Sequence, residues 1–234
     1  GDGLIKTSRG LGDLLPWSNT NAAGQTHVDD YGDRMSGSNF VSGVSTAEDE
    51  AIINYVRVRS IGTRTIAIDE DNNVWVGGIG WADAQGPNWH QKISGTNGLW
   101  LTSPFDIGAG GYGGLIDANG VLWSTRGSNF NLLRYDPATS TASNLGDTNG
   151  TYGIGIDPQN GQIWVSGLGS VYCLNADGSL RGSYYHNGID SKGVAVDQST
   201  NVWIAHPYAD EYTQEFTVAH LRADTGAWVG NVPL

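Results

Sequence analysis

The sequence predicts an all-β fold, a β-propeller of four-stranded antiparallel blades, and three observations predict it. The 234 residues include 35 glycines and 9 tryptophans, a composition typical of short strands joined by tight turns. A short pattern of an aspartate, a turn and a tryptophan-bearing strand occurs four times. Each copy is followed by two further strand-like runs, so each repeat has four strands, the number in a propeller blade.

The four copies share an order of elements. An apolar run ends in an aspartate, whose carboxylate accepts backbone N–H groups two residues on and so opens a turn. The copies are DEDNNVW (69–75), DANGVLW (117–123), DPQNGQIW (157–164) and DQSTNVW (197–203). We expect the aspartates Asp69, Asp117, Asp157 and Asp197 to be turn residues. We expect the tryptophans to pack between neighbouring sheets as core residues; they are Trp75, Trp123, Trp164 and Trp203.

The aspartates follow one another at intervals of 48, 40 and 40 residues, which sets the repeat boundaries. We interpret the chain as a single propeller domain, 1–234, whose repeats cover approximately 61–108, 109–148, 149–188 and 189–234. Residues 1–60 lack the aspartate–tryptophan hairpin. They form an atypical terminal blade or closing segment. We favour a five-bladed ring, and the alternative is that the chain is the C-terminal part of a larger propeller.

Charge and cysteine content limit the function classes. The net charge of −12 excludes a nucleic-acid partner, because phosphate binding needs a basic face. Cys173 is the single cysteine, lies in a strand pattern and is interpreted as structural. No run of about 18 apolar residues occurs, so no membrane span is expected. We expect the protein to be extracellular, at a cell surface or periplasmic, although the chain shows no signal peptide.

Aspartate makes up 19 of the 24 acidic residues. A turn-rich β protein explains this excess, and calcium coordination is the alternative explanation. Three aspartates cluster in the glycine-bearing stretch THVDDYGDRMSG: Asp29, Asp30 and Asp33. We name them as a possible calcium site, against the alternative of a solvated acidic loop.

Candidate ligand-binding residues follow from the architecture, because the innermost strands of a propeller line a central channel. The residue just before each innermost strand is expected at the channel mouth: Arg64, Tyr112, Tyr152 and Lys192. Two cations and two phenols favour an anionic or hydroxyl-rich ligand, such as a carboxylate, a sugar or an acidic peptide. The alternative is that they are ordinary rim residues.

The first repeat carries an insertion, GIGWADAQGPNWHQ at 78–91. Trp81 and Trp89 lie in it, beyond the core strand. Large aromatic side chains on a surface loop are common anchors for sugars or proteins, which makes both candidate contacts. Alternatively, the two rings fold back and seal the loop.

The repeat resembles the NHL and virginiamycin B lyase-like (streptogramin lyase-like) propeller superfamily. The likeness lies in YGIGIDPQNGQIWVSG, KGVAVDQSTNVWIA and LLRYDPATST, and it covers approximately 61–234. The resemblance implies a propeller fold. The superfamily includes antibiotic-cleaving lyases, protein-interaction modules and many secreted proteins. A lyase of this type would need histidine and glutamate with magnesium at the channel face. No histidine stands just before an inner strand, so no catalytic residue is carried over from the resemblance.

The stretch HPYADEYTQEFTVAH at 206–220 contains histidines and carboxylates that are suited to acid–base chemistry or metal binding. For a metal-assisted lyase, the candidates are His206 or His220 with Glu211 or Glu215. No GxSxG elbow or phosphate loop is present. We therefore favour a non-catalytic binding, adhesion or assembly module recognising a glycan, an anionic group or a protein, possibly with calcium. The alternatives are the lyase and a self-assembling subunit of an extracellular filament or surface layer.

Overall fold

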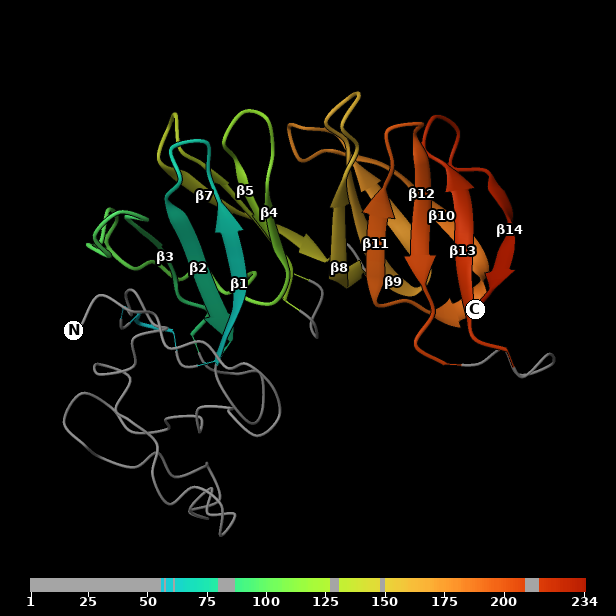
Figure 1. Ribbon diagram of the computed structural model, residues 1–234, viewed down its shortest axis with the longest axis horizontal. Coiled ribbons are helices and arrows are strands. Elements are labelled where there is room, and N and C mark those ends of the chain that lie inside the picture. Colours follow the sequence, from blue (N-terminus) through green and yellow to red (C-terminus); the bar gives the residue numbers. More distant parts are fainter. Residues whose placement is uncertain are drawn as a thin grey trace, which may run out of the picture. The chain divides into compact units, whose positions relative to one another are not determined.

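The computed structural model describes residues 56, 58–60, 62–79, 87–126, 131–147, 150–208 and 215–234. The chain divides into two compact units, Gly1–Arg57 and Val58–Leu234, and every described strand lies in the second unit (Figure 1). Over the described ranges the elements are all strands, and no helix occurs. The all-β class predicted from the sequence is confirmed.

The first two sheets follow the repeat pattern. In the first sheet β1 (Gly62–Ile68), β2 (Val74–Ile79) and β3 (His90–Ile93) pair in that order. Its fourth member is the segment 100–105, which bridges β3 at Trp100 and Phe105. The second sheet has the order β4 (Gly114–Ile116), β5 (Leu122–Ser124), β6 (Asn131–Asp136) and β7 (Thr141–Asp147).

The third sheet consists of β8 (Gly150–Ile156), β9 (Ile163–Leu174) and β10 (Leu180–Asp190). Strand β9 supplies two of its members, because it folds back on itself. Cys173 Sγ lies 3.6 Å from Gln162 Oε1, whereas eleven residues of extended strand would span about 36 Å. Gly169 supplies the left-handed backbone that such a tight reversal uses, with φ of 67°.

The fourth sheet contains β11 (Gly193–Val196), β12 (Asn201–Ala205), β13 (Thr217–Arg222) and β14 (Trp228–Pro233), paired in sequence order. All pairings in the four sheets are antiparallel. The first strands of successive sheets are neighbours: β1 contacts β4, β4 contacts β8 and β8 contacts β11 (Figure 1). This is blade-to-blade packing, and the predicted propeller fold of four-stranded antiparallel blades is confirmed. The number of blades in the whole ring stays a prediction.

The four repeated aspartates are turn residues, as predicted. One carboxylate oxygen of each accepts a backbone N–H two or four residues further on. The donors are Asn73 for Asp69, Asn119 for Asp117, Gln159 for Asp157 and Ser199 for Asp197, at 2.8–2.9 Å. Two of these aspartates also accept a second bond that was not predicted. Trp123 Nε1 donates to Asp117 Oδ2 at 2.9 Å, and Trp203 Nε1 donates to Asp197 Oδ2 at 3.0 Å.

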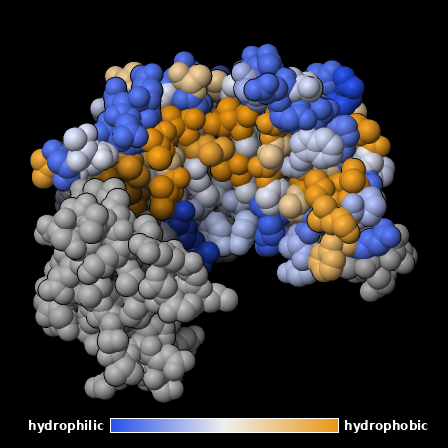
Figure 2. All heavy atoms as spheres, in the orientation of Figure 1, coloured by the Kyte–Doolittle hydropathy of each residue, from blue (hydrophilic) through white to orange (hydrophobic). Residues whose placement is uncertain are grey.

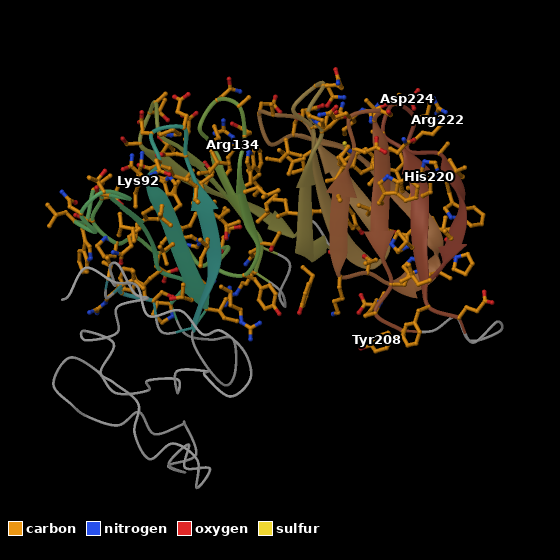
Figure 3. The ribbon with its side chains drawn as sticks, in the orientation of Figure 1. Lys92, Arg134, Tyr208, His220, Arg222 and Asp224 are labelled. Carbon is orange, nitrogen blue, oxygen red and sulfur yellow. The ribbon has the colours of Figure 1, made fainter. Side chains whose placement is uncertain are left out.

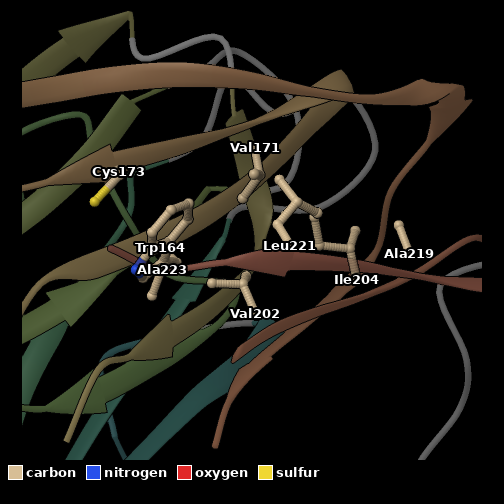
Figure 4. Packing of buried hydrophobic residues seen from close by; sticks show 8 residues of the cluster. All are labelled: Trp164, Val171, Cys173, Val202, Ile204, Ala219, Leu221 and Ala223. Atoms are coloured by element: carbon tan, nitrogen blue, oxygen red, sulfur yellow. The ribbon is translucent and has the colours of Figure 1, made fainter. Parts of the chain in front are cut away.

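Three of the four repeat tryptophans are core residues, and the prediction for the fourth is corrected. Trp75, Trp123 and Trp164 are 0–1% exposed. Each packs toward the following sheet, as Trp164 does against Val202, Leu221 and their neighbours (Figure 4). Trp203 is half-buried, because no described sheet follows β11–β14. Its ring stacks on His220 instead, with centroids 4.4 Å apart.

Cys173 is fully buried in the same cluster as Trp164 (Figure 4). Burial raises the pKa of its thiol to about 11. A buried thiol of this kind is neither a nucleophile nor a ligand at neutral pH, which agrees with a structural role. Among the described residues, no helix is long and apolar enough to cross a membrane.

Candidate functional site

The backbone at the predicted channel mouth is held by hydroxyl groups of the preceding sheet. In three successive interfaces, a threonine or serine hydroxyl donates to the carbonyl of the candidate residue in the next sheet. The pairs are Thr65 to Tyr112 (3.3 Å), Thr125 to Tyr152 (2.8 Å) and Ser166 to Lys192 (3.2 Å). These three hydroxyl-bearing residues are fully buried. The backbone at the three positions is therefore fixed by the sheet next to it.

The side chains of Arg64, Tyr112, Tyr152 and Lys192 meet in one line, which we call the polar row. Arg64 Nη1 donates to the Tyr112 hydroxyl at 2.8 Å. The hydroxyls of Tyr112 and Tyr152 are hydrogen-bonded to each other. Lys192 Nζ lies 4.3 Å from the centroid of the Tyr152 ring. Four side chains from four consecutive sheets thus form a continuous chain of contacts.

The aromatic rings of the polar row are covered by their neighbours. The guanidinium carbon of Arg64 lies 4.6 Å from the centroid of the Tyr112 ring, a cation–π contact. The two tyrosine rings are tilted against each other with centroids 4.5 Å apart. Together with Lys192 over Tyr152, these contacts leave the hydroxyls, more than the ring faces, available to a ligand.

The electrostatics of the row favour hydrogen-bond donation. Burial and the hydrogen bond with Tyr152 raise the pKa of Tyr112 above the usual phenol value, against the opposing influence of Arg64. Tyr112 is therefore protonated at neutral pH. At the far end of the row, Lys192 Nζ lies 3.3 Å from Asp190 Oδ2. The side chain of Lys192 is 38% exposed, and Arg64 is exposed too, so both cations are accessible from solvent.

Of the two insertion tryptophans, Trp81 lies outside the described residues. Trp89 is half-buried, and the guanidinium of Arg59 lies 5.3 Å from its ring centroid. Trp89 O accepts from Gly78 N, and Gly78 is paired with Thr63. Trp89 is therefore at the same end of the first sheet as Arg64, two strand spacings away, or about 10 Å.

The histidines named for the lyase alternative do not form one site. His206 is 5% exposed and bonds Thr217 and His186 at 2.8 and 3.0 Å, on the side of the fourth sheet that faces the third. His220 lies on β13 (Figure 3) and stacks on Trp203, on the opposite side. Glu215 is exposed, and Glu211 lies outside the described residues. Within the described part of the chain, no group of three metal-ligating side chains occurs.

The proposed calcium residues Asp29, Asp30 and Asp33 also lie outside the described residues. The structure therefore leaves the calcium site as a prediction.

Two buried polar contacts between sheets were not predicted. His186, fully buried, lies with its Nδ1 3.0 Å from Nε2 of His206, and burial and His206 lower the pKa of His186 to about 4. His90 Nε2 lies 3.2 Å from Ser124 Oγ, and burial lowers the pKa of His90 to about 4. No sequence signal identifies either pair, because the partners belong to different repeats at unrelated positions.

The Ser124–His90 contact has the atoms of a nucleophile and its base. However, Ser124 is 0% exposed and His90 is 1% exposed. The second ring nitrogen of His90 bonds the Asn88 carbonyl at 2.9 Å, and Ser124 Oγ accepts from Gly111 N at 2.8 Å. A substrate has no access to this serine, so the contact is structural.

Comparison with known proteins shows the fold. No protein-family model matches the sequence, and no curated protein matches it. A streptogramin B lyase structure is similar with a TM-score of 0.58 and 18% identity, over 76% of this chain and 56% of that one. The virginiamycin B lyase of Staphylococcus aureus gives 0.58 and 15%, over 74% and 56%. Kuenenia stuttgartiensis hydrazine synthase gives 0.58 and 13%, over 77% and 51%.

The chain spans just over half the length of these proteins. The resemblance to the virginiamycin B lyase-like propellers, seen first in the repeat, is confirmed at the level of the fold. At such low identity the similarity shows the fold and does not show an activity for this chain.

Proposed function

We propose that this propeller is a non-catalytic binding module whose ligand contacts the polar row. One observation carries the proposal: four successive sheets place an arginine, two tyrosines and a lysine at the same position, and each of these side chains contacts the next. A scaffold made of repeats has no structural need for three polar residue types at one position. Recognition has that need, because each ligand group requires its own partner.

Rigidity supports the same function. The hydroxyls of Thr65, Thr125 and Ser166 hold the carbonyls of the next sheet. A site whose groups are held before the ligand arrives loses less conformational entropy on binding. The row is thus suited to bind without rearrangement.

The test is a binding screen with paired variants. Purified protein is screened against neutral glycans, acidic glycans, organic acids and peptides. Tyr112→Phe and Tyr152→Phe remove the hydroxyls and keep the rings, so we expect both to weaken the identified ligand about tenfold with little change in Tm. Tyr208→Phe, on an exposed tyrosine outside the row (Figure 3), is the control. A ligand whose affinity is indifferent to both row variants would refute the proposal.

We propose an extracellular, cell-surface or periplasmic location and a calcium ion at Asp29, Asp30 and Asp33 as parts of the same function. The acidic, aspartate-rich composition supports both, since calcium prefers several carboxylate oxygens. The calcium proposal is tested by thermal unfolding with EDTA and then with added calcium or magnesium. A Tm that calcium leaves unchanged would contradict it. Fractionation of cells that express the native gene tests the location.

A second candidate function, self-assembly, is favoured by the outer edge of the fourth sheet. Among the described strands, β14 pairs with β13 alone. It exposes three apolar side chains: Trp228 at 46%, Val229 at 56% and Val232 at 47%. An exposed apolar edge strand is a template for pairing with another chain. Sedimentation of the protein and of Val229→Lys tests this, and a monomer at high concentration would refute it.

A further inference from the structure

We infer that the polar row binds the carboxylate of an aliphatic or aromatic acid, whose carbon body lies against the exposed isoleucines of β1. The inference rests on the proposed binding function and adds the chemical class of the ligand. It follows from the hydrogen-bond donors of the row, its charge and the apolar side chains beside it.

The row presents hydrogen-bond donors toward a ligand. Arg64 has five N–H donors and gives one of them to Tyr112. The hydrogen bond between the two phenols uses the proton of one hydroxyl. Whichever phenol donates, the other hydroxyl keeps its own proton and can donate it to a ligand. Lys192 has three donors, and Asp190 pairs with the ammonium on one side. A ligand rich in acceptors therefore fits, and carboxylate oxygens are strong acceptors for arginine.

The charge of the site matches a single negative charge. Arg64 and Lys192 contribute two positive charges, and Asp190, 3.3 Å from Lys192, contributes one negative charge, which leaves +1. The whole chain carries −12 and repels polyanions at long range. A monoanionic carboxylate is thus favoured over a phosphate dianion or an acidic polymer.

Neutral sugars are poorly matched to the row. Arg64, Lys192 and the partner ring cover the faces of Tyr112 and Tyr152. A sugar ring would find hydroxyl and ammonium donors there, but it would compete with a cation or the partner ring for each tyrosine face.

An apolar surface adjoins the row. Ile66 and Ile68 are 63% and 62% exposed, whereas Thr65 and Ala67 between them are buried. Side chains alternate along a strand, so the two isoleucines share the face of β1 opposite Thr65 and Ala67, and they lie about 7 and 13 Å further along the strand than Arg64. Leu115 on the neighbouring strand β4 is 36% exposed. Figure 2 shows hydrophobic surface gathered over β1 and β4. A ligand body that covers these side chains gains about 25 cal/mol per Å² of apolar surface removed from water.

The experiment is calorimetric titration of the whole chain with three probes. Octanoate has the carboxylate and an apolar body, octan-1-ol has the body alone, and trigalacturonate has carboxylates on a hydroxyl-rich body. We expect octanoate to bind about tenfold or more tightly than octan-1-ol, because the alcohol lacks the charge-assisted bonds. We expect trigalacturonate to bind more weakly than octanoate.

Variants separate the two halves of the site. Arg64→Gln should weaken octanoate about tenfold, and Ile66→Ser should weaken it severalfold. The matched controls are Arg222→Gln, on an exposed arginine paired with Asp224 (Figure 3), and Leu180→Ser, on an exposed leucine of β10. Both controls should leave affinity unchanged.

The outcomes distinguish this inference from the proposed function. If trigalacturonate or a neutral glycan binds more tightly than octanoate, and Arg64→Gln abolishes that binding, the ligand class is wrong and the binding module stands. Equal affinity for octanoate and octan-1-ol would also overturn the carboxylate assignment. If neither the probes nor the ligands of the wider screen bind, both proposals fail.

Discussion

Two buried tryptophans offer an internal comparison of a made and an unmade hydrogen bond. Trp123 and Trp164 occupy the same position in consecutive repeats, and both are 0% exposed. Trp123 Nε1 donates to Asp117 Oδ2 at 2.9 Å. Trp164 Nε1 is buried, and no described residue accepts its proton. The third repeat, DPQNGQIW, has one residue more between aspartate and tryptophan than DANGVLW does, which removes the carboxylate from reach.

The perturbation is tryptophan to phenylalanine at each position. Both substitutions remove a similar volume from a packed cluster, so the cavity contributions to the free energy of unfolding are comparable. Trp123→Phe also loses a bond to a charged acceptor, about 1.5–3 kcal/mol. Trp164→Phe removes a buried donor without a partner, which recovers about 1–3 kcal/mol. We therefore expect Trp123→Phe to destabilise the protein at least about 2 kcal/mol more than Trp164→Phe.

The assay is equilibrium urea unfolding followed by far-ultraviolet circular dichroism, with the slope of the transition compared between variants. Arg134 lies 5.6 Å from the Trp123 ring centroid, a contact that phenylalanine weakens by about 0.5 kcal/mol. The expected difference exceeds that contribution. Equal destabilisation by the two substitutions, or a larger effect at Trp164, would refute the role we give to the Asp117–Trp123 bond.

Three further predictions concern titration, reactivity and the hydroxyl contacts. Burial lowers the pKa of both His90 and His186 to about 4, so the folded state keeps them neutral while the unfolded chain takes up protons below about pH 6.5. Stability should fall from pH 6.5 to 4, by up to about 1.4 kcal/mol per pH unit for each histidine; urea midpoints measure this, and a slope unchanged in His186→Asn would contradict it. Cys173, whose pKa is raised to about 11, should react with iodoacetamide at pH 8 only when the protein unfolds, and rapid labelling of native protein would count against its burial. Thr125→Val strips the hydroxyl bonds to Gly113 N and Tyr152 O; it should cost about 1–3 kcal/mol and weaken ligand binding, whereas the exposed Thr141→Val should do neither.

The fold could be predicted from the sequence because the same local interactions recur in each of the four repeats. Each aspartate caps its own turn, and each apolar run alternates within its own strand, so the elements follow from neighbours in the chain. The same alignment identified the positions of the polar row, since Arg64, Tyr112, Tyr152 and Lys192 stand at one distance before the repeated aspartate. Contacts between sheets were harder to predict from the sequence. Trp203 has the same local pattern as Trp123, and its partial exposure depends on what packs beyond its sheet.

Hydrogen bonds between side chains of different repeats could not be predicted from the sequence, for a related reason. His90 meets Ser124, and His186 meets His206, across distances of 34 and 20 residues. Nothing in the local pattern around any of these residues specifies the partner, because the meeting point is set by the spacing of two sheets. The order of the hydrogen bonds in the polar row has the same origin. Its residues could be named from the sequence, and their line of contacts could not.

The bonds between sheets involve backbone carbonyls and not the side chains of the polar row. This explains why the residue types in the row can differ while the fold repeats. The inter-sheet hydroxyl bonds go to the carbonyls of Tyr112, Tyr152 and Lys192. A carbonyl is present whatever the side chain is, so the packing of one sheet on the next places no demand on the identity of the residue. Side chains at these positions can therefore differ without disturbing the packing, as the proposed binding function requires. Packing residues in the same sheets behave differently, since Trp123 and Trp164 are alike and fully buried. Substitution within the row should therefore change binding far more than folding, and a row variant that unfolded the protein would argue against this separation.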